Sequence, residues 1–242
     1  ETYYAMQANL TLAEIIYHAG DFLTALFIVF LVLGFMRLAF MYFLMVKEKR
    51  AEKRRHYPQL TKQNAPHVSI IVPAYNEEVN CVRTVETLLK EDYPSFDIIF
   101  VDDGSKDHTL QRMHDAFDGN SKVRILGKKN GGKASALNYG IEHTDSEYLV
   151  CIDADTQLRP DAVGKLMQHF LLDSEHRIGA VAGNVKVGNQ RNMLTRWQAI
   201  EYTTSQNFDR MAYSYINAVT VVPGAIGAFR KEAIVKAGGL TT

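Results

Sequence analysis

Two aspartates at the end of a short apolar run are the residues of this chain that most clearly suggest a chemical function. Residues 148–152 read Tyr-Leu-Val-Cys-Ile, and Asp153 and Asp155 follow directly. The run is too short for an amphipathic helix and predicts a buried strand of a parallel sheet, at whose carboxyl end ligands bind. Because residues two apart on an extended chain face the same way, the two carboxylates could hold Mg or Mn on a diphosphate. The same aspartates could instead only end the strand or cap the next helix.

Polar residues or glycines also follow three other predicted strands. They occupy residues 74–77 after the first strand, 102–105 after the second and 128–133 after the third. A single polar strand end is ordinary turn chemistry, whereas four at one edge of a sheet indicate a binding site.

The residue types at these strand ends fit a nucleoside diphosphate. Tyr75 offers an aromatic face for a base, and Asp103 could accept a hydrogen bond from a base N–H or a ribose hydroxyl. Lys133 stands at the start of a predicted helix, where backbone N–H groups and the helix dipole favour phosphate. With a metal at Asp153 and Asp155, these residues predict a site for a nucleoside diphosphate that carries a further group.

A nucleoside triphosphatase is the competing interpretation. Residues 127–133 match the P-loop spacing G-x4-G-K between a strand and a helix. The next residue is Ala134, where a P-loop needs Ser or Thr to bind Mg, and Ser135 comes one place too late. No G-x-G-x-x-G opens the first helix either, so the sequence disfavours both a P-loop and a dinucleotide site.

Apolar runs alternate with helical patterns from residue 67 onward. This alternation predicts an α/β fold with a doubly wound, mostly parallel sheet. After residue 184 the alternation weakens. The expected strands cover residues 68–72, 98–101, 123–126, 148–152, 178–182 and 219–222; the expected helices cover 78–90, 107–117, 133–142, 160–172 and 194–215, and a tight turn is expected at 223–227.

The part before the sheet predicts a membrane anchor. Residues 22–46 are almost entirely apolar, and roughly 20 apolar residues span a bilayer. Arg37 is the exception: it could snorkel toward the cytosol, face other helices, or mark a span that ends near residue 36. Six Lys and Arg residues in 47–55 place that end on the cytoplasmic side. We therefore expect a lead over 1–21, a transmembrane helix over 22–46 and a basic linker over 47–66.

Composition excludes some classes of function. The formal net charge of the 242 residues is +0, which gives no global attraction to nucleic acid. The two cysteines, Cys81 and Cys151, suggest no disulfide framework or zinc spacing and fit a reducing cytosol. The sequence begins with Glu1 and stops soon after residues 238–240, so we expect a fragment of a longer chain.

Four motifs, in order and spacing, resemble the signature of family 2 inverting glycosyltransferases, whose catalytic domain has the GT-A fold. They are residues 73–77 (Pro-Ala-Tyr-Asn-Glu), 101–107 (Val-Asp-Asp-Gly-Ser-Lys-Asp), 131–138 (Gly-Gly-Lys-Ala-Ser-Ala-Leu-Asn) and 153–155 (Asp-Ala-Asp). Within that family the chain is most similar to processive membrane synthases of β-linked polysaccharides. These include the synthases of poly-N-acetylglucosamine, chitin oligosaccharide, hyaluronan and cellulose.

The resemblance implies a role for each matching residue. It implies a donor half over 67–190 and the start of an acceptor half over 191–242. The metal, Mg or Mn, would lie on Asp155 with help from Asp153. The residues expected to bind the nucleotide sugar are Pro73, Tyr75, Glu77, Asp103, Lys133, Asp153 and Asp155; those expected near the acceptor are Gln198, Glu201, Tyr202, Pro223, Gly224 and Ala225.

The resemblance also implies an activity and partners. We expect inverting transfer of a sugar, N-acetylglucosamine first among the candidates, from a UDP-sugar donor to a growing polysaccharide acceptor. The general base is expected after Thr242, so residues 1–242 alone would bind donor without making polymer. The expected location is the cell (inner) membrane, with the catalytic domain in the cytoplasm. A small membrane partner subunit is an expected partner, and no nucleic acid is expected to bind. A non-processive transferase acting on a lipid carrier and a non-catalytic nucleotide-binding protein are the alternatives.

Overall fold

The computed structural model describes residues 2–241 except 187, 189–191, 202, 203, 205, 206, 220 and 223, and it describes residues 2–13 by their backbone alone. The chain forms two compact units. The first contains residues 1–54 and 208–218, and the second contains residues 55–207 and 219–242.

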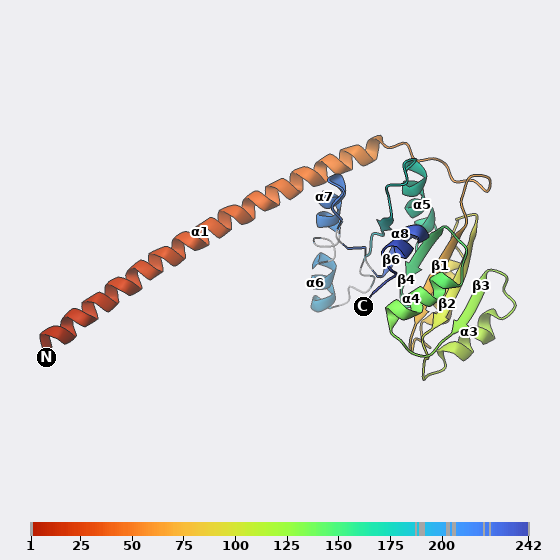
Figure 1. Ribbon diagram of the computed structural model, residues 1–242, viewed down its shortest axis with the longest axis horizontal. Helices are drawn as coiled ribbons and strands as arrows, with labels where there is room; N and C mark the ends of the chain where they lie inside the picture. Colours follow the sequence, from red (N-terminus) through yellow and green to blue (C-terminus); the bar gives the residue numbers. More distant parts are fainter. Residues whose placement is uncertain are drawn as a thin grey trace. The chain divides into compact units, whose positions relative to one another are not determined.

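The second unit is built on a six-stranded sheet in the order β3-β2-β1-β4-β6-β5 (Figure 1). The first four strands along the chain, β1 to β4, are parallel to one another, whereas β6 is antiparallel to both β4 and β5. This arrangement confirms the predicted α/β fold with a mostly parallel sheet. The strands are β1 (Val68–Ala74), β2 (Phe96–Asp102), β3 (Val123–Gly127), β4 (Tyr148–Ile152), β5 (Ala180–Ala182) and β6 (Ile226–Arg230).

Helices cover both faces of this sheet because its strand residues alternate between two apolar clusters. Ile70 and Val150 belong to the larger cluster, which α2 (Cys81–Leu88), α3 (Thr109–Phe117) and α5 (Ala162–Leu172) cover. Their strand neighbours Ile71 and Leu149 belong to the second cluster, beneath α4 (Lys133–Glu142) and α8 (Lys231–Lys236). Each of these four strand residues is 0% exposed, so the sheet has a core on each side.

The segment after β5 differs from its prediction in two ways. The expected single helix over 194–215 is two α-helices, α6 (Met193–Glu201) and α7 (Asp209–Tyr215), with wider π-helical turns among the described residues between them. The expected strand over 219–222 is wrong, because the described residues there have no strand structure. The strand begins at Ile226 instead, where pairing with β4 is available. Local β-propensity could not reveal that partner.

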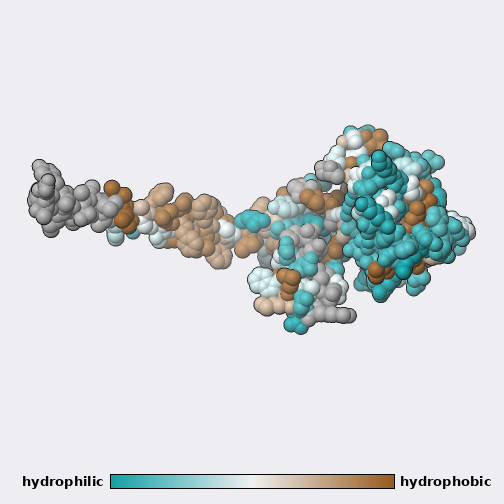
Figure 2. All heavy atoms as spheres, turned by 90° about the horizontal axis from the view of Figure 1, so that it is seen from below, coloured by the Kyte–Doolittle hydropathy of each residue, from teal (hydrophilic) through white to brown (hydrophobic). Residues whose placement is uncertain are grey.

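The first unit consists of α1 (Thr2–Arg54) and α7. Residues 14–54 of α1 form one helix that is long and apolar enough to cross a membrane. Figure 2 shows hydrophobic side chains along the middle of this helix. From Met41 onward α7 covers one side of α1, so that Met41 and Leu44 are each 4% exposed and pack with Ala212. Arg37 lies 3.8 Å from the Asp209 carboxylate of α7.

A buried carboxyl group caps α5, the helix that follows the loop of Asp153 and Asp155. Glu91 is 8% exposed, and its Oε2 accepts a hydrogen bond from the Val163 N–H at 3.2 Å. Its Oε1 is buried and has no hydrogen-bond partner in the described part of the chain. Burial, aided by the charges of Asp161 and Asp92, raises the pKa of Glu91 to about 8.

This raised pKa predicts that stability falls as the pH rises. The folded protein keeps a proton on Glu91 up to about pH 8, whereas the unfolded chain releases it near 4.5, so folding binds a proton between these values. We expect the free energy of unfolding to drop on the order of 2–4 kcal/mol across this range. Glu91→Gln should remove that part of the slope in chemical unfolding measured from pH 5 to 9. Glu86→Gln, an exposed position on α2, should leave it; equal slopes in both variants would refute the assignment.

Candidate functional site

The Asp103 carboxylate holds the glycine-rich loop before α4 against the end of β2. Asp103 is 3% exposed, and its Oδ1 accepts from Lys128 Nζ at 2.7 Å and from the Gly131 N–H at 3.0 Å. Its Oδ2 accepts from the Gly132 N–H at 2.7 Å. A buried carboxylate is costly unless charged and polar groups surround it, and these three donors supply that environment. The loop that leads to Lys133 is thereby fixed to the sheet.

Glycine at position 104 permits this close approach. Gly104 has φ +72°, and a Cβ there would lie 2.8 Å from the backbone nitrogen of Asn130. The loop also bonds to the strand end through the backbone, since the Lys128 N–H donates to the Asp102 carbonyl at 2.9 Å. Any larger residue at 104 would push the glycine-rich loop away from Asp103.

Lys133 connects this loop to the end of β4. It is the first residue of α4, and its ammonium forms an ion pair with Asp153 Oδ1. A Cβ at Gly224 would lie 2.8 Å from Lys133 Nζ, so the turn before β6 leaves room for the lysine. The Asp153 N–H donates to the Ala225 carbonyl at 3.4 Å. Asp103, Lys133 and Asp153 therefore belong to one continuous set of contacts at the carboxyl edge of the sheet.

The two aspartates after β4 differ in their surroundings. β4 ends at Ile152, and Ala154 and Asp155 lie in a turn, so the expected extended backbone between the aspartates was wrong. The turn is fixed by the Thr84 hydroxyl, which donates to the Ala154 carbonyl at 2.6 Å. Asp155 is exposed and has no hydrogen-bond or ion-pair partner among the described residues. It is therefore free to bind a ligand.

The neighbouring thiol is not a competing reactive group. Burial raises the pKa of the Cys151 thiol to about 12, with Lys133 opposing and Asp153 adding to the shift. Cys151 and Cys81 are both free and buried.

The end of β1 presents an aromatic ring at the same edge. Tyr75 is 42% exposed, and Asn76 turns the chain in the left-handed region at φ 55°. The Asn76 side chain accepts from the Lys106 N–H at 2.8 Å, which ties this turn to the loop after β2. Glu77 is half-buried, with its N–H donating to the Thr109 hydroxyl at 2.8 Å. Pro73 is buried within β1.

The expected acceptor residues separate into three groups. Gly224 and Ala225 contact Lys133 and Asp153 at the carboxyl edge of the sheet. Gln198 and Glu201 lie on α6, none of whose described side chains is buried, and no described hydrogen bond or ion pair ties Gln198 to that edge. Tyr202 and Pro223 lie outside the described residues.

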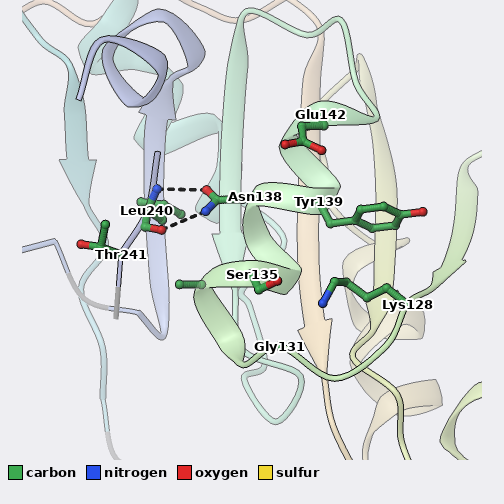
Figure 3. A pocket seen from close by; sticks show the side chains of 9 residues that line it. Lys128, Gly131, Ser135, Asn138, Tyr139, Glu142, Leu240 and Thr241 are labelled. Carbon is green, nitrogen blue, oxygen red and sulfur yellow. Dashed lines mark hydrogen bonds between the residues drawn. The ribbon is translucent and has the colours of Figure 1, made fainter. Parts of the chain in front are cut away.

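Sequence reasoning missed Lys128, which neutralises Asp103. Nothing in the run Lys128-Lys129 distinguishes the two lysines, because their roles depend on how the loop folds back onto β2. It also missed a cavity of about 440 Å³ along the outer side of α4, beside Lys128 and Ser135 (Figure 3). This cavity does not include Asp153 or Asp155.

The sequence profile of glycosyl transferase family 2 matches residues 69–236, which include all four strand ends described above. This chain belongs to that family. A poly-beta-1,6-N-acetyl-D-glucosamine synthase of Staphylococcus epidermidis is 31% identical over 198 residues, covering 81% of this chain and 47% of the relative. One of Staphylococcus aureus (strain COL) is 29% identical over 197 residues with the same shares. This family 2 chain thus spans about half the length of the curated relatives it matches.

A solved structure supports the assignment of the fold. A mannosyltransferase of Pyrobaculum calidifontis, in complex with GDP-Man and Mn2+, has a TM-score of 0.64 and 23% sequence identity, covering 84% of this chain and 56% of that chain. The likeness shows that this family 2 chain has a GT-A-like α/β fold.

The paired lysines of the glycine-rich loop allow a matched test of the Asp103 contacts. Lys128→Met removes the ammonium from a buried carboxylate and should lower the free energy of unfolding by about 2 kcal/mol. Lys129→Met changes an exposed neighbour and should alter it by less than about 0.5 kcal/mol. Chemical unfolding of the detergent-solubilised protein measures both. Equal effects of the two substitutions would contradict the role given to Lys128.

Proposed function

We propose that this chain is the donor-binding part of a membrane glycosyltransferase that moves N-acetylglucosamine from UDP-N-acetylglucosamine to a growing polysaccharide with inversion. The observation that carries the proposal is the continuous set of contacts from Asp103 through the glycine-rich loop to Lys133 and Asp153. The 31% identity to a poly-beta-1,6-N-acetyl-D-glucosamine synthase supports the choice of sugar and acceptor.

The nucleoside would bind at the ends of β1 and β2. The Tyr75 ring is exposed there and offers a face for uracil, with Pro73 and Glu77 in the strand end that carries it. Asp103 would accept from the base or the ribose. Since its oxygens already accept from Lys128 and two backbone N–H groups, a nucleoside donor would have to displace one of them. We expect Lys128 to yield first, because its ammonium can turn toward the phosphates.

The diphosphate would bind between Lys133 and the two aspartates. No group of three or more His, Cys, Asp or Glu suited to a metal exists in the described part of the chain. Magnesium in diphosphate sites commonly takes only one or two carboxylates and completes its shell with phosphate oxygens and water. Asp155, which has no partner among the described residues, and Asp153, whose Oδ1 pairs with the Lys133 ammonium, fit this donor set. Bound there, Mg or Mn would neutralise the charge that develops on the departing diphosphate.

The chain's own residues would then promote departure of UDP. Lys133, at the start of α4, places an ammonium and the N-terminal end of a helix at the phosphates, which stabilises developing negative charge. An acceptor hydroxyl would attack the anomeric carbon from the opposite face as the bond to the diphosphate breaks, while a carboxylate base takes its proton. We assign no base within residues 1–242. Gly224 and Ala225 would border the acceptor sugar, with Gln198, Glu201, Tyr202 and Pro223 farther along its path.

The membrane span would cover about 20 residues of α1. Exposed apolar side chains dominate α1 from Phe22 to Phe40, which is about 30 Å of helix and matches the hydrocarbon thickness; Tyr42 and Phe43 beyond it are also exposed. From Met41 onward α7 covers one side of α1, so this part would lie in the cytosol. Arg37, one turn inside the boundary, would be stabilised by its ion pair with Asp209.

The donor site is tested by replacing its exposed carboxylate in the full-length protein. Asp155→Ala should lower metal-dependent transfer from UDP-N-acetylglucosamine by about 100-fold or more, because the diphosphate loses its metal ligand. Calorimetry with UDP should also lose its dependence on Mn2+. Asp145→Ala is the matched control, since Asp145 is exposed just before the other end of β4.

Three other results would contradict the proposal. Undiminished metal-dependent turnover in Asp155→Ala would refute the donor site. Binding of UDP by the wild-type full-length protein without any turnover would favour a nucleotide sensor. Products on a lipid phosphate instead of a polymer would favour the non-processive transferase.

Topology is tested by single cysteines in α1. Ala51→Cys should react with a membrane-impermeant maleimide only when the cytosolic side is accessible, whereas Val32→Cys should not react from either side. The native Cys81 and Cys151 are buried and give a low background. Labelling of position 51 from the outside, or of position 32 in intact membranes, would overturn the proposed span.

A further inference from the structure

The side-chain amide of Asn138 grips the backbone of the segment that follows α8. Its Nδ2 donates to the Leu240 carbonyl at 2.8 Å, and its Oδ1 accepts from the Leu240 N–H at 2.9 Å (Figure 3). Both polar groups of one residue are thus satisfied by both polar groups of another, 102 positions away. We call this pair of hydrogen bonds the Asn138 latch.

Two glycines bring Leu240 to the latch. Gly238 and Gly239 have φ +85° and +93°, a region that side chains rarely adopt, and their N–H groups bond back to the last turn of α8. A Cβ at Gly239 would lie 3.3 Å from Asn138 Oδ1. Leu240 then packs against the apolar cluster beneath α4 and α8.

The outer side of α4 has little other support near the latch. The cavity of about 440 Å³ lies directly beside it and is bordered by both Asn138 and Leu240 (Figure 3). On its inner side, α4 rests on β1 and β2 through residues such as Gly140, where a Cβ would lie 2.6 Å from Ile71. Among the described residues, the two hydrogen bonds of the latch link the middle of α4 to the chain after α8.

α4 also carries Lys133, five residues before Asn138, or about 7.5 Å along the helix axis. At that level the start of the helix is held by the Gly131 and Gly132 N–H bonds to Asp103, and the Lys133 ammonium pairs with Asp153. A helix fixed at two levels cannot slide or tilt without breaking one of them. The latch consequently restrains the position of the Lys133 ammonium.

We propose that Asn138 is a positioning residue that acts through Lys133: the latch sets the place of the lysine that receives the donor diphosphate. This inference rests on the proposed function and extends it to a residue that does not touch the donor. It follows that losing the latch should weaken recognition of the diphosphate while leaving recognition of the nucleoside unchanged.

Binding by the full-length protein separates these two effects. With Mn2+ present, Asn138→Ala should weaken UDP binding roughly five- to tenfold, because both latch hydrogen bonds are lost. Binding of uridine should not change. Asn138→Asp keeps the acceptor for the Leu240 N–H but not the donor, and its effect should lie in between. Glu142→Gln, one turn along α4 at the edge of the same cavity, is the control and should match wild type.

A double-mutant cycle tests the route through Lys133. In a Lys133→Ala background, Asn138→Ala should cost no further UDP affinity, since the lysine that the latch positions is gone. Equal losses with and without Lys133 would mean that Asn138 acts through general stability, and the inference would fail. Equal weakening of uridine and UDP would overturn it as well.

Hydrogen exchange in the wild-type protein gives a readout independent of ligands. The Leu240 amide should exchange slowly, and Asn138→Ala should speed it at least about tenfold. Fast exchange in the wild type would refute the latch even if every variant folded poorly. If wild-type protein bound no UDP while Leu240 stayed protected, the proposed function would fail and the latch would remain as a structural feature only.

Discussion

The carboxylate of Asp103 is the constraint on which the carboxyl edge of this sheet depends. A charge that is 3% exposed has lost most of its hydration, so the protein must surround it with donors or lose several kcal/mol. The donors come from the glycine-rich loop: two backbone N–H groups and the Lys128 ammonium. The loop can supply them only where a backbone passes close to β2, which explains the glycine at 104. Once the loop is fixed, the start of α4 and its first residue, Lys133, are fixed with it.

α4 transmits this constraint across the fold. Its inner face packs tightly on β1 and β2, where Gly140 leaves no room for a side chain beside Ile71. Its first residue contacts the end of β4, and its middle contacts the chain after α8 through Asn138. This ten-residue helix therefore adds a second connection, besides the pairing of β4 with β6, between the parallel strands and the antiparallel part of the sheet. A shift of either part would change the contacts that hold α4.

The elements that the sequence predicts well are those with a strong period. Buried runs such as 68–72 and 148–152 gave strands, and the order of strands and helices gave a mostly parallel sheet. Polar strand ends then had to share one edge, so the grouping of Asp103, Lys133 and Asp153 followed from topology. The region after residue 184 was harder, because β6 pairs antiparallel with β4, more than 70 residues earlier in the chain.

Individual contacts could not be predicted from the sequence either, because they also depend on how distant segments come together in the fold. Lys128 and Lys129 are equivalent in sequence, and only the fold of the loop aims one of them at Asp103. Arg37 and Asp209 are 172 positions apart in the chain. The sequence therefore could not show that the charge in the apolar helix is paired with a carboxylate of α7. The prediction for Asp153 and Asp155 was wrong for a similar reason. Their spacing suggested an extended chain, but the Thr84 hydroxyl holds the residue between them in a turn.

Under the proposed function, charge balance around Lys133 would let the edge bind a donor without leaving a charge unpaired. In this structure the Lys133 ammonium is the cation beside Asp153, so neither charge stands alone in a partly buried place. A nucleoside diphosphate arriving with a divalent cation would offer a negative partner to the lysine and a positive partner to the aspartate. Each would exchange one opposite charge for another, and the net cost of desolvation would stay small. Asp155, exposed and without a partner in the described chain, would then gain its first opposite charge.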